Sequence, residues 1–155
     1  MIGGIAVADE ILVGVDRSET SISALRWAVD EAARRRTTVR AVSVHMAQGH
    51  MIVRDDSRRG IATVTTQSVH TELAEALATI VGSLDITVPV DQVVLVGRAE
   101  EVLVDMSREA ALLVLGSHGD SRVLTSLTLG AVTAHCIRHA ACPVVVIPRC
   151  GQRPG

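Results

Sequence analysis

Short aliphatic runs alternate five times along this chain with segments of helical periodicity. The aliphatic runs are residues 10–15 (EILVGV), 39–46 (VRAVSVHM), 92–96, 111–115 and 143–147 (PVVVI). Between them, apolar residues recur every three or four positions, as in Ile22, Leu25 and Val29, which is the spacing of one helix face. Strands that alternate with helices need right-handed crossovers and form a mostly parallel sheet covered on both faces. We therefore expect an α/β fold with a doubly wound, Rossmann-like sheet.

Further helices are predicted over residues 69–84, 100–109 and 126–140, and a polar segment, residues 47–60, is predicted to be a mobile loop. The length of 155 residues suits one domain, which we place at residues 8–149 with a flexible tail at 150–155. Trp27 is the only aromatic residue of the chain. The core must therefore be built from aliphatic side chains, which favours parallel strands buried under helices.

Composition argues against several classes of partner. The formal net charge is −2 and no long basic run occurs, so we expect no nucleic acid to bind; Arg34, Arg35 and Arg36 are interpreted as a solvated helix end. No apolar run approaches the roughly 18 residues of a membrane span, and the first residues do not resemble a secretion signal. The cysteines, at 136, 142 and 150, are odd in number, which favours reduced thiols and a cytoplasmic location.

A glycine-rich loop follows the fourth apolar run. Residues 115–133, LGSHGDSRVLTSLTLGAVT, contain three glycines and six hydroxyl side chains, a composition that can gather amide N–H groups around an anion. In doubly wound sheets ligands bind beyond the carboxyl ends of the strands, where the strand order reverses. If the first and fourth strands are neighbours there, this loop and the turn formed by Asp16, Arg17 and Ser18 face one crevice.

Three segments together resemble the universal stress protein family. They are ILVGVDRSETSISALRWAVDEA near the start, VLVGRAEEVL in the middle, and VLGSHG…LGAVT…CPVVVIPR at the end, and the resemblance extends over about the whole chain. It implies a five-stranded parallel sheet of order 3-2-1-4-5 and subunits that form a homodimer through the last strand. It also implies an ATP site in the nucleotide-binding branch, whose signature is Gly, two residues, Gly, nine residues, Gly, then Ser or Thr.

The resemblance also implies roles for individual residues. Asp16 would hold the ribose, and Met46 would offer backbone groups to adenine. Leu115 and Gly116 would border the nucleotide. The residues that would surround the phosphates, through main-chain amides and the Thr133 hydroxyl, are Gly119, Gly130, Ala131, Val132 and Thr133. The cofactor implied is ATP, with or without Mg, and no metal ligand of the protein itself is expected.

The chain departs from the family pattern at four places. Ten residues rather than nine separate Gly119 from Gly130, and Ala131 replaces the hydroxyl residue of the signature. Arg17 stands where many relatives have glycine, and Asp120 brings a negative charge toward the phosphates, which weakens anion binding.

Structural explanations for the same residues remain open. Asp16 followed by Glu19 fits a capping box at a helix start, and Gly116 and Gly119 could serve only a tight turn. His135 and His139 lie four residues apart with Cys136 between them. That spacing can serve zinc, but no third ligand is evident, so an ordinary helix surface is the preferred interpretation.

Motifs for other chemistries are missing from the sequence. There is no GxxxxGK[ST] loop, no GxGxxG turn after the first strand and no GxSxG elbow. No pair of carboxylates and no nucleophile with a base stands out, so we assign no catalytic residue and expect at most a weak ATPase. We expect a cytoplasmic stress-response protein that binds ATP as a sensor or switch. The alternative is a dimeric protein-interaction module of the same fold that does not bind nucleotide and contacts an unknown protein partner.

Overall fold

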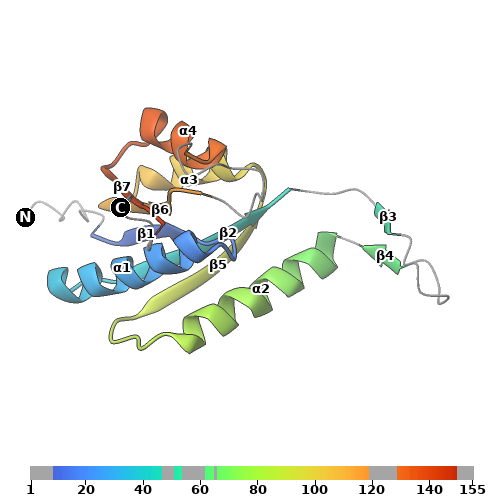
Figure 1. The fold of residues 1–155 in the computed structure, drawn as a ribbon, viewed down its shortest axis with the longest axis horizontal. Coiled ribbons are helices and arrows are strands. Elements are labelled where there is room, and N and C mark those ends of the chain that lie inside the picture. The colour runs from blue at the N-terminus through green and yellow to red at the C-terminus, as the bar shows by residue number, and fades with distance from the viewer. Residues whose placement is uncertain (1–8, 47–50, 54–61, 65, 119–128, 150–155) are drawn as a thin grey trace, which may run out of the picture.

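A five-stranded parallel sheet forms the centre of the protein in the computed structural model, which describes residues 9–46, 51–53, 62–64, 66–118 and 129–149 (Figure 1). Its strands are β1 (Ile11–Gly14), β2 (Val39–His45), β5 (Val90–Val96), β6 (Leu112–Gly116) and β7 (Val144–Ile147). They lie in the order β5-β2-β1-β6-β7, and each neighbouring pair is parallel. In order of sequence this arrangement is 3-2-1-4-5, so the predicted sheet is confirmed.

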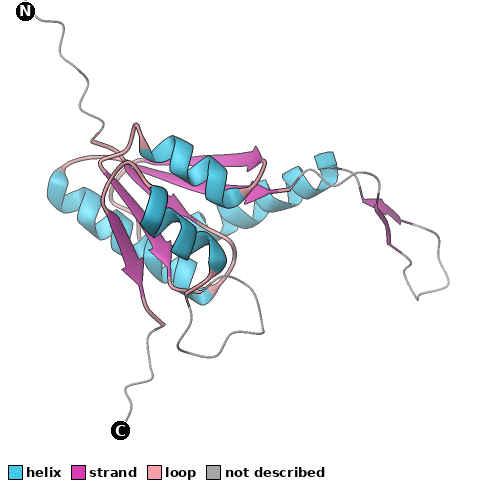
Figure 2. Cartoon of the chain, turned by 90° about the horizontal axis from the view of Figure 1, so that it is seen from above, coloured by secondary structure: helices cyan, strands magenta, loops and turns pink. Residues whose placement is uncertain are grey.

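Four helices cover the two faces of this sheet. They are α1 (Glu19–Arg35), α2 (Thr66–Ser83), α3 (Ala99–Ser107) and α4 (Ala131–His139). Helices α1 and α2 lie on one face, and α3 and α4 lie on the other (Figures 1 and 2). The strand order reverses between β1 and β6, because β1 passes through α1 to β2 on one side while β6 passes through α4 to β7 on the other. The carboxyl ends of β1 and β6 are therefore the expected place for a ligand.

Alternate residues of each central strand enter two separate hydrophobic cores. Ile11 and Val13 of β1 pack with Leu25 and Val29 of α1, whereas Leu12 lies in the core of the opposite face with residues of α3 and α4. All these β1 and α1 side chains are at most 3% exposed. The aliphatic composition thus gives β1, β2 and β6 two buried faces, as a parallel sheet between helices requires.

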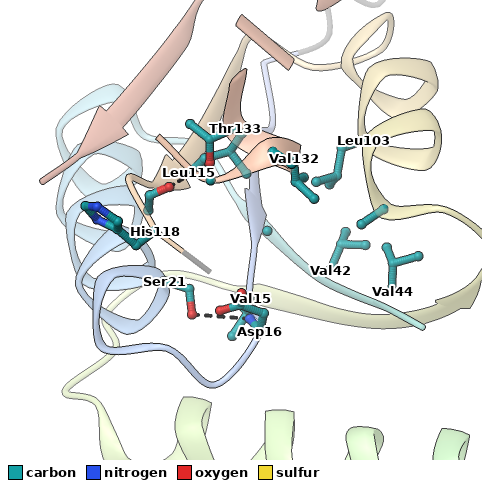
Figure 3. Close-up of a pocket in the computed structure, with 15 residues that line it drawn as sticks. Val15, Asp16, Ser21, Val42, Val44, Leu103, Leu115, His118, Val132 and Thr133 are labelled. Carbon is teal, nitrogen blue, oxygen red and sulfur yellow. Dashed lines mark hydrogen bonds between the residues drawn. The ribbon is translucent and has the colours of Figure 1, made fainter. Parts of the chain in front are cut away.

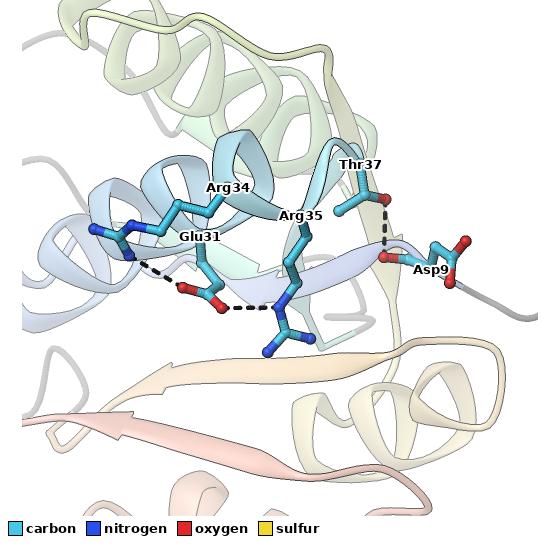
Figure 4. A network of polar contacts seen from close by, with 5 residues as sticks. All are labelled: Asp9, Glu31, Arg34, Arg35 and Thr37. Carbon is cyan, nitrogen blue, oxygen red and sulfur yellow. Dashed lines mark hydrogen bonds and ion pairs between the residues drawn. The ribbon is translucent and has the colours of Figure 1, made fainter.

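The end of α1 is the solvated, basic segment that the sequence suggests. Glu31 pairs with Arg34 and Arg35 at 3.1 Å and 2.8 Å (Figure 4), and the arginines lower the pKa of the Glu31 carboxyl. The helix stops at Arg36, whose left-handed backbone (φ 56°) forms the C-cap. The Thr37 hydroxyl then donates to the carbonyl of Asp9 at 2.8 Å, which ties this end of α1 to the start of β1 (Figure 4).

Two expectations about local structure are wrong. The segment predicted as a loop, residues 47–60, contains β3 (Met51–Val53), which pairs antiparallel with β4 (Ala62–Val64), just after that segment, as a separate two-stranded sheet (Figure 1). These strands have only three residues each, too few for the alternation to be recognised. Helix α4 begins at Ala131 instead of residue 126, because Gly130 has extended backbone (φ −58°, ψ 150°) and forms the N-cap. The predicted tail at 150–155 lies outside the described residues.

Candidate functional site

A pocket of about 400 Å³ opens beyond the carboxyl ends of β1 and β6, at the reversal of strand order. Fifteen residues line it, and they come from β1, β2, β6, the first turns of α1 and α4, the first two turns of α3, and the segments beside them (Figure 3). They are Gly14, Val15, Asp16, Ser21, Val42, Val44, Ala99, Leu103, Leu115, Gly116, His118, Gly130, Ala131, Val132 and Thr133. Among the residues that the structure describes, strand ends and helix starts converge here around a cavity large enough for a small molecule.

The two sides of the pocket differ in polarity. Val42, Val44 and Leu103 form an apolar wall on one side, while Asp16 and Ser21 lie opposite them (Figure 3). Val42 and Val44 share a face because they are alternate residues of one strand. An apolar wall that faces polar groups suits a ligand with one flat or apolar part and one polar part.

The first turn of α4 closes a third side of the pocket. Ala131, Val132 and Thr133 are its first three residues, and the N–H groups at the start of a helix have no acceptor inside the helix. The preceding N–H, that of Gly130, is engaged, since it donates to the carbonyl of Ser117 at 2.8 Å. The positive end of the helix dipole lies at the same place, so this side of the pocket is suited to an anionic group.

The Thr133 hydroxyl is committed to the fold. It is buried, and it donates to the carbonyl oxygen of Gly116 at 2.8 Å (Figure 3). Because a hydroxyl has one hydrogen to donate, this group cannot also donate to a phosphate while that bond persists. Thr133 therefore offers the pocket its backbone N–H, and the role that the family pattern implies for its hydroxyl does not fit this arrangement.

Asp16 braces the turn between β1 and α1. Its Oδ1 accepts from the backbone N–H of Ser18 at 3.0 Å and also from the Ser18 hydroxyl. The N-cap of α1 is Ser18, whose hydroxyl oxygen accepts from the N–H of Ser21 at 3.2 Å. The predicted capping box, with Asp16 as the N-cap and Glu19 as its partner, is therefore wrong. The N-cap is two residues further on, at Ser18.

Arg17, between these two residues, has left-handed backbone with φ 74°. Glycine adopts this conformation without the steric cost that a Cβ brings. The geometry thus gives a physical reason for the glycine that the family pattern has at this position. The Arg17 side chain is exposed and is not part of the pocket lining.

Gly116 is required by packing between β6 and α1. A Cβ at this position would lie 2.4 Å from Oγ1 of Thr20, 2.7 Å from its carbonyl carbon and 2.8 Å from the N of Ser21. A Cβ essentially never makes contacts shorter than 3.0 Å, and two of these three involve backbone atoms. Gly116 therefore has a structural function at the floor of the pocket, whether or not a ligand approaches it.

Seven of the nine predicted site residues line the pocket. Of the other two, Met46 is outside the lining and Gly119 is outside the described residues. The seven are Asp16, Leu115, Gly116, Gly130, Ala131, Val132 and Thr133. Met46 is not part of the lining; its side chain is 63% exposed, and its carbonyl oxygen lies 3.3 Å from Nδ1 of His45. Gly119 lies outside the described residues, as does Asp120.

Sequence reasoning missed the walls contributed by β2 and α3. Val42, Val44, Ala99 and Leu103 line the pocket but are not among the nine predicted site residues, although Met46 follows the same strand as Val42 and Val44. The available signal was the alternation of Val42 and Val44 toward the carboxyl end of a central strand, which places both on one face beside the strand reversal.

Neither a metal centre nor a reactive thiol is found in the described part of the chain. No group of three or more His, Cys, Asp or Glu side chains could hold a metal there. The rings of His135 and His139 contact each other, with 4.5 Å between their centroids and a tilt of 42°. Burial raises the pKa of the Cys136 thiol to about 11.

No helix among the residues that the structure describes is long and apolar enough to cross a membrane.

Comparison with known proteins places the chain in a family. The model of the universal stress protein family matches residues 8–148. A universal stress protein of Mycobacterium tuberculosis is 34% identical over 137 residues, which cover 88% of this chain and 47% of that protein. The chain spans about half the length of the curated relatives it matches.

Solved structures share the fold at lower identity. A universal stress protein from Archaeoglobus fulgidus, solved in complex with dAMP, has a TM-score of 0.61 and 21% identity, and the match covers 91% of this chain and 98% of that one. A family protein from Arabidopsis thaliana, solved with AMP bound, has a TM-score of 0.57 and 19% identity, with coverage of 95% and 96%. Because the family model matches residues 8–148 and a relative is 34% identical over 88% of the chain, this chain belongs to the universal stress protein family.

Proposed function

We propose that this protein binds an adenine nucleotide, with ATP as its ligand, in the pocket between β1 and β6. The observation that carries the proposal is the arrangement of that pocket, which is lined both by an apolar wall and by the first turn of α4, whose N–H groups have no acceptor within the helix. A purine base and a phosphate chain need such surroundings at opposite ends. The nucleotides present in the A. fulgidus and Arabidopsis structures support the same class of ligand.

The ligand would lie across the pocket with its base toward β2 and α3. Val42, Val44 and Leu103 supply the apolar surface for the base. The N–H groups of Ala131, Val132 and Thr133 then receive the phosphates at the start of α4. Magnesium, where present, would be held by the phosphates, since the described residues offer no metal cluster.

Asp16 would accept hydrogen bonds from the ribose hydroxyls. It already accepts from Ser18 through Oδ1, but an ionised carboxylate has about four acceptor sites on two oxygens. Bracing the turn and holding a ribose are therefore compatible functions of one side chain. The first would fix the direction of the carboxylate for the second.

The biological role proposed is that of a sensor or switch in the stress response rather than of an enzyme. The described pocket lining contains no pair of acidic side chains, and the hydroxyl that contacts a lining histidine, that of Ser117 at 2.8 Å from Nδ1 of His118, belongs to a residue outside the lining, so hydrolysis would be slow at most. We also propose a cytoplasmic location, since the two described cysteines, Cys136 and Cys142, are not in a disulfide with each other.

A homodimer through β7 is part of the proposal. This strand is at one edge of the sheet, and its four residues, VVVI, are all half-buried. Strand geometry leaves the N–H and C=O groups of Val144 and Val146 on the open side, because Pro143 and Ile147 face β6 as acceptors for Leu113 and Ser117. Pairing with β7 of a second copy would cover this edge.

Titration calorimetry with ATP, AMP and adenosine tests nucleotide binding. Ala99 lines the pocket at the start of α3 and is half-buried, so Ala99→Phe should fill the pocket with little effect on the core. The matched control is Ala33→Phe, at an exposed position of α1. We expect the wild type and the control to bind ATP, and the Ala99 variant to bind at least tenfold more weakly. Absence of ATP binding by the wild type would favour the protein-interaction module.

A further inference from the structure

The described chain after β6 is held in place from three directions. Ser117 donates its N–H to the carbonyl of Ile147 in β7 at 2.9 Å, and its own carbonyl accepts from the N–H of Gly130 before α4 at 2.8 Å. The third contact comes from α1, where the Thr20 hydroxyl donates to the carbonyl of His118 at 2.6 Å. This last bond joins residues 98 positions apart, on opposite sides of the strand reversal.

The position of Thr20 suits it to hold this contact. Thr20 is in the first turn of α1 and only 5% exposed, and a buried hydroxyl needs a partner to offset the loss of water. Its Oγ1 is 3.5 Å from the hydroxyl of Ser18, the N-cap residue. One side chain therefore links the turn that carries Asp16 to the segment that leaves β6.

The close packing of Gly116 makes this link short. Because Gly116 has no Cβ, the end of β6 lies directly on Thr20 and Ser21. The carbonyl of His118, the last residue described before 119–128, then comes within reach of the Thr20 hydroxyl. Without that bond, the Ser117 and Gly130 contacts would still hold the chain to β7 and α4, but no described hydrogen bond would hold its His118 end to α1.

We propose that Thr20 is a positioning residue for phosphate binding, acting through the carbonyl of His118. The inference rests on the proposed function, because it concerns the phosphate side of the same pocket. It states that Thr20 sets the position of the segment after β6 and of the start of α4 relative to the turn that contains Asp16. Thr20 does not line the pocket. Its hydroxyl fixes the distance between the two sides of the pocket and thereby the placement of the first-turn N–H groups of α4 around a phosphate.

The matched variants are Thr20→Val and Thr20→Ser. Valine keeps the shape of threonine and removes the hydroxyl, whereas serine keeps the hydroxyl and removes a methyl group. Hydrogen exchange in the absence of ligand is the first measurement. We expect the valine variant to exchange the amides of Ser117 and Gly130 several-fold faster than the wild type, with the amide of Val39, which donates to Pro89 at the far end of the sheet, unchanged. The serine variant should behave as the wild type.

Ligand affinity is the second measurement. The valine variant should lose up to about tenfold in affinity for ATP, because the order that binding must then restore is worth at most one hydrogen bond, and less than twofold for adenosine, which has no phosphate. Unchanged exchange at Ser117 and Gly130 would overturn the inference, as would equal losses for ATP and adenosine. If the wild type binds neither ligand, the proposed function fails and the phosphate role with it, while faster exchange would show that the link itself exists.

Discussion

Replacing Gly116 with alanine tests the close contact between β6 and α1 on which the floor of the pocket depends. The added Cβ would lie 2.4 Å from Oγ1 of Thr20, 2.7 Å from the Thr20 carbonyl carbon and 2.8 Å from the N of Ser21. A side-chain rotation can move Oγ1, but it would break the bond to His118. The two backbone atoms can move only if the first turn of α1 shifts.

The expected cost follows from these contacts. Forcing one extra carbon into a close-packed site destabilises a protein by about 1–3 kcal/mol. Alanine recovers about 0.4–1 kcal/mol by restricting the unfolded chain. The balance is a loss of about 0–2.6 kcal/mol. Because two of the short contacts are with backbone atoms, we expect Gly116→Ala to lower the free energy of unfolding by about 1–2 kcal/mol, which corresponds to a fall in Tm of about 2–8 °C for a domain of this size.

Gly82→Ala is the matched control for this experiment. Gly82 is in the last turn of α2, and a Cβ there would meet nothing within 4 Å. The same substitution should leave stability unchanged or raise it by up to about 1 kcal/mol, because alanine is the better helix former. Adding Thr20→Ala to Gly116→Ala should not restore stability, because the two backbone contacts remain.

Equilibrium unfolding in urea, followed by circular dichroism at one protein concentration, gives these free energies. A Gly116→Ala variant within 0.5 kcal/mol of the wild type would refute the packing described here. So would full recovery in the double variant, since only the Oγ1 contact would then matter.

Three further predictions concern the edge strand, the thiols and the phosphate side of the pocket. Val146→Pro removes an N–H on the open side of β7 and should convert a dimer into folded monomer in sedimentation velocity; a variant that remains dimeric would exclude β7 as the interface. Because the pKa of the Cys136 thiol is about 11, only about 0.1% of it is thiolate at pH 8. A thiol reagent should therefore modify Cys136 far more slowly in the folded protein than in the protein unfolded by urea, and equal rates would contradict its burial. Ala131→Ser supplies the hydroxyl missing from the family signature and should raise ATP affinity by about two- to tenfold without changing that for adenosine; equal gains would place the hydroxyl away from the phosphates.

The fold could be predicted from the sequence because the strands are buried on both faces. A run such as residues 111–115 is apolar throughout, and only a central parallel strand or a buried helix requires that. The order of the strands came from the family resemblance, since periodicity carries no information about which strands are neighbours. The sheet pairings then set β1 beside β6, which creates the pocket.

Local details of the site could not be predicted because they depend on backbone conformations. Asp16 and Ser18 can each cap a helix, and the left-handed backbone of Arg17 decides between them by adding one more turn. The sequence predicted a start of α4 at residue 126. The helix begins at Ala131, because the backbone of Gly130 is extended and forms the N-cap. The bond between Thr133 and Gly116 joins two elements, so no local pattern indicates it.

An NMR titration of ¹⁵N-labelled protein with ATP tests nucleotide binding in this pocket most directly. The account predicts saturable shifts that are concentrated on pocket amides, above all Gly14, Asp16 and the first turn of α4, residues 131–133. Amides at the far end of the sheet, such as Val39, should shift little. Saturable shifts centred elsewhere, or none at millimolar ATP, would contradict the proposal that the crevice between β1 and β6 is a nucleotide site.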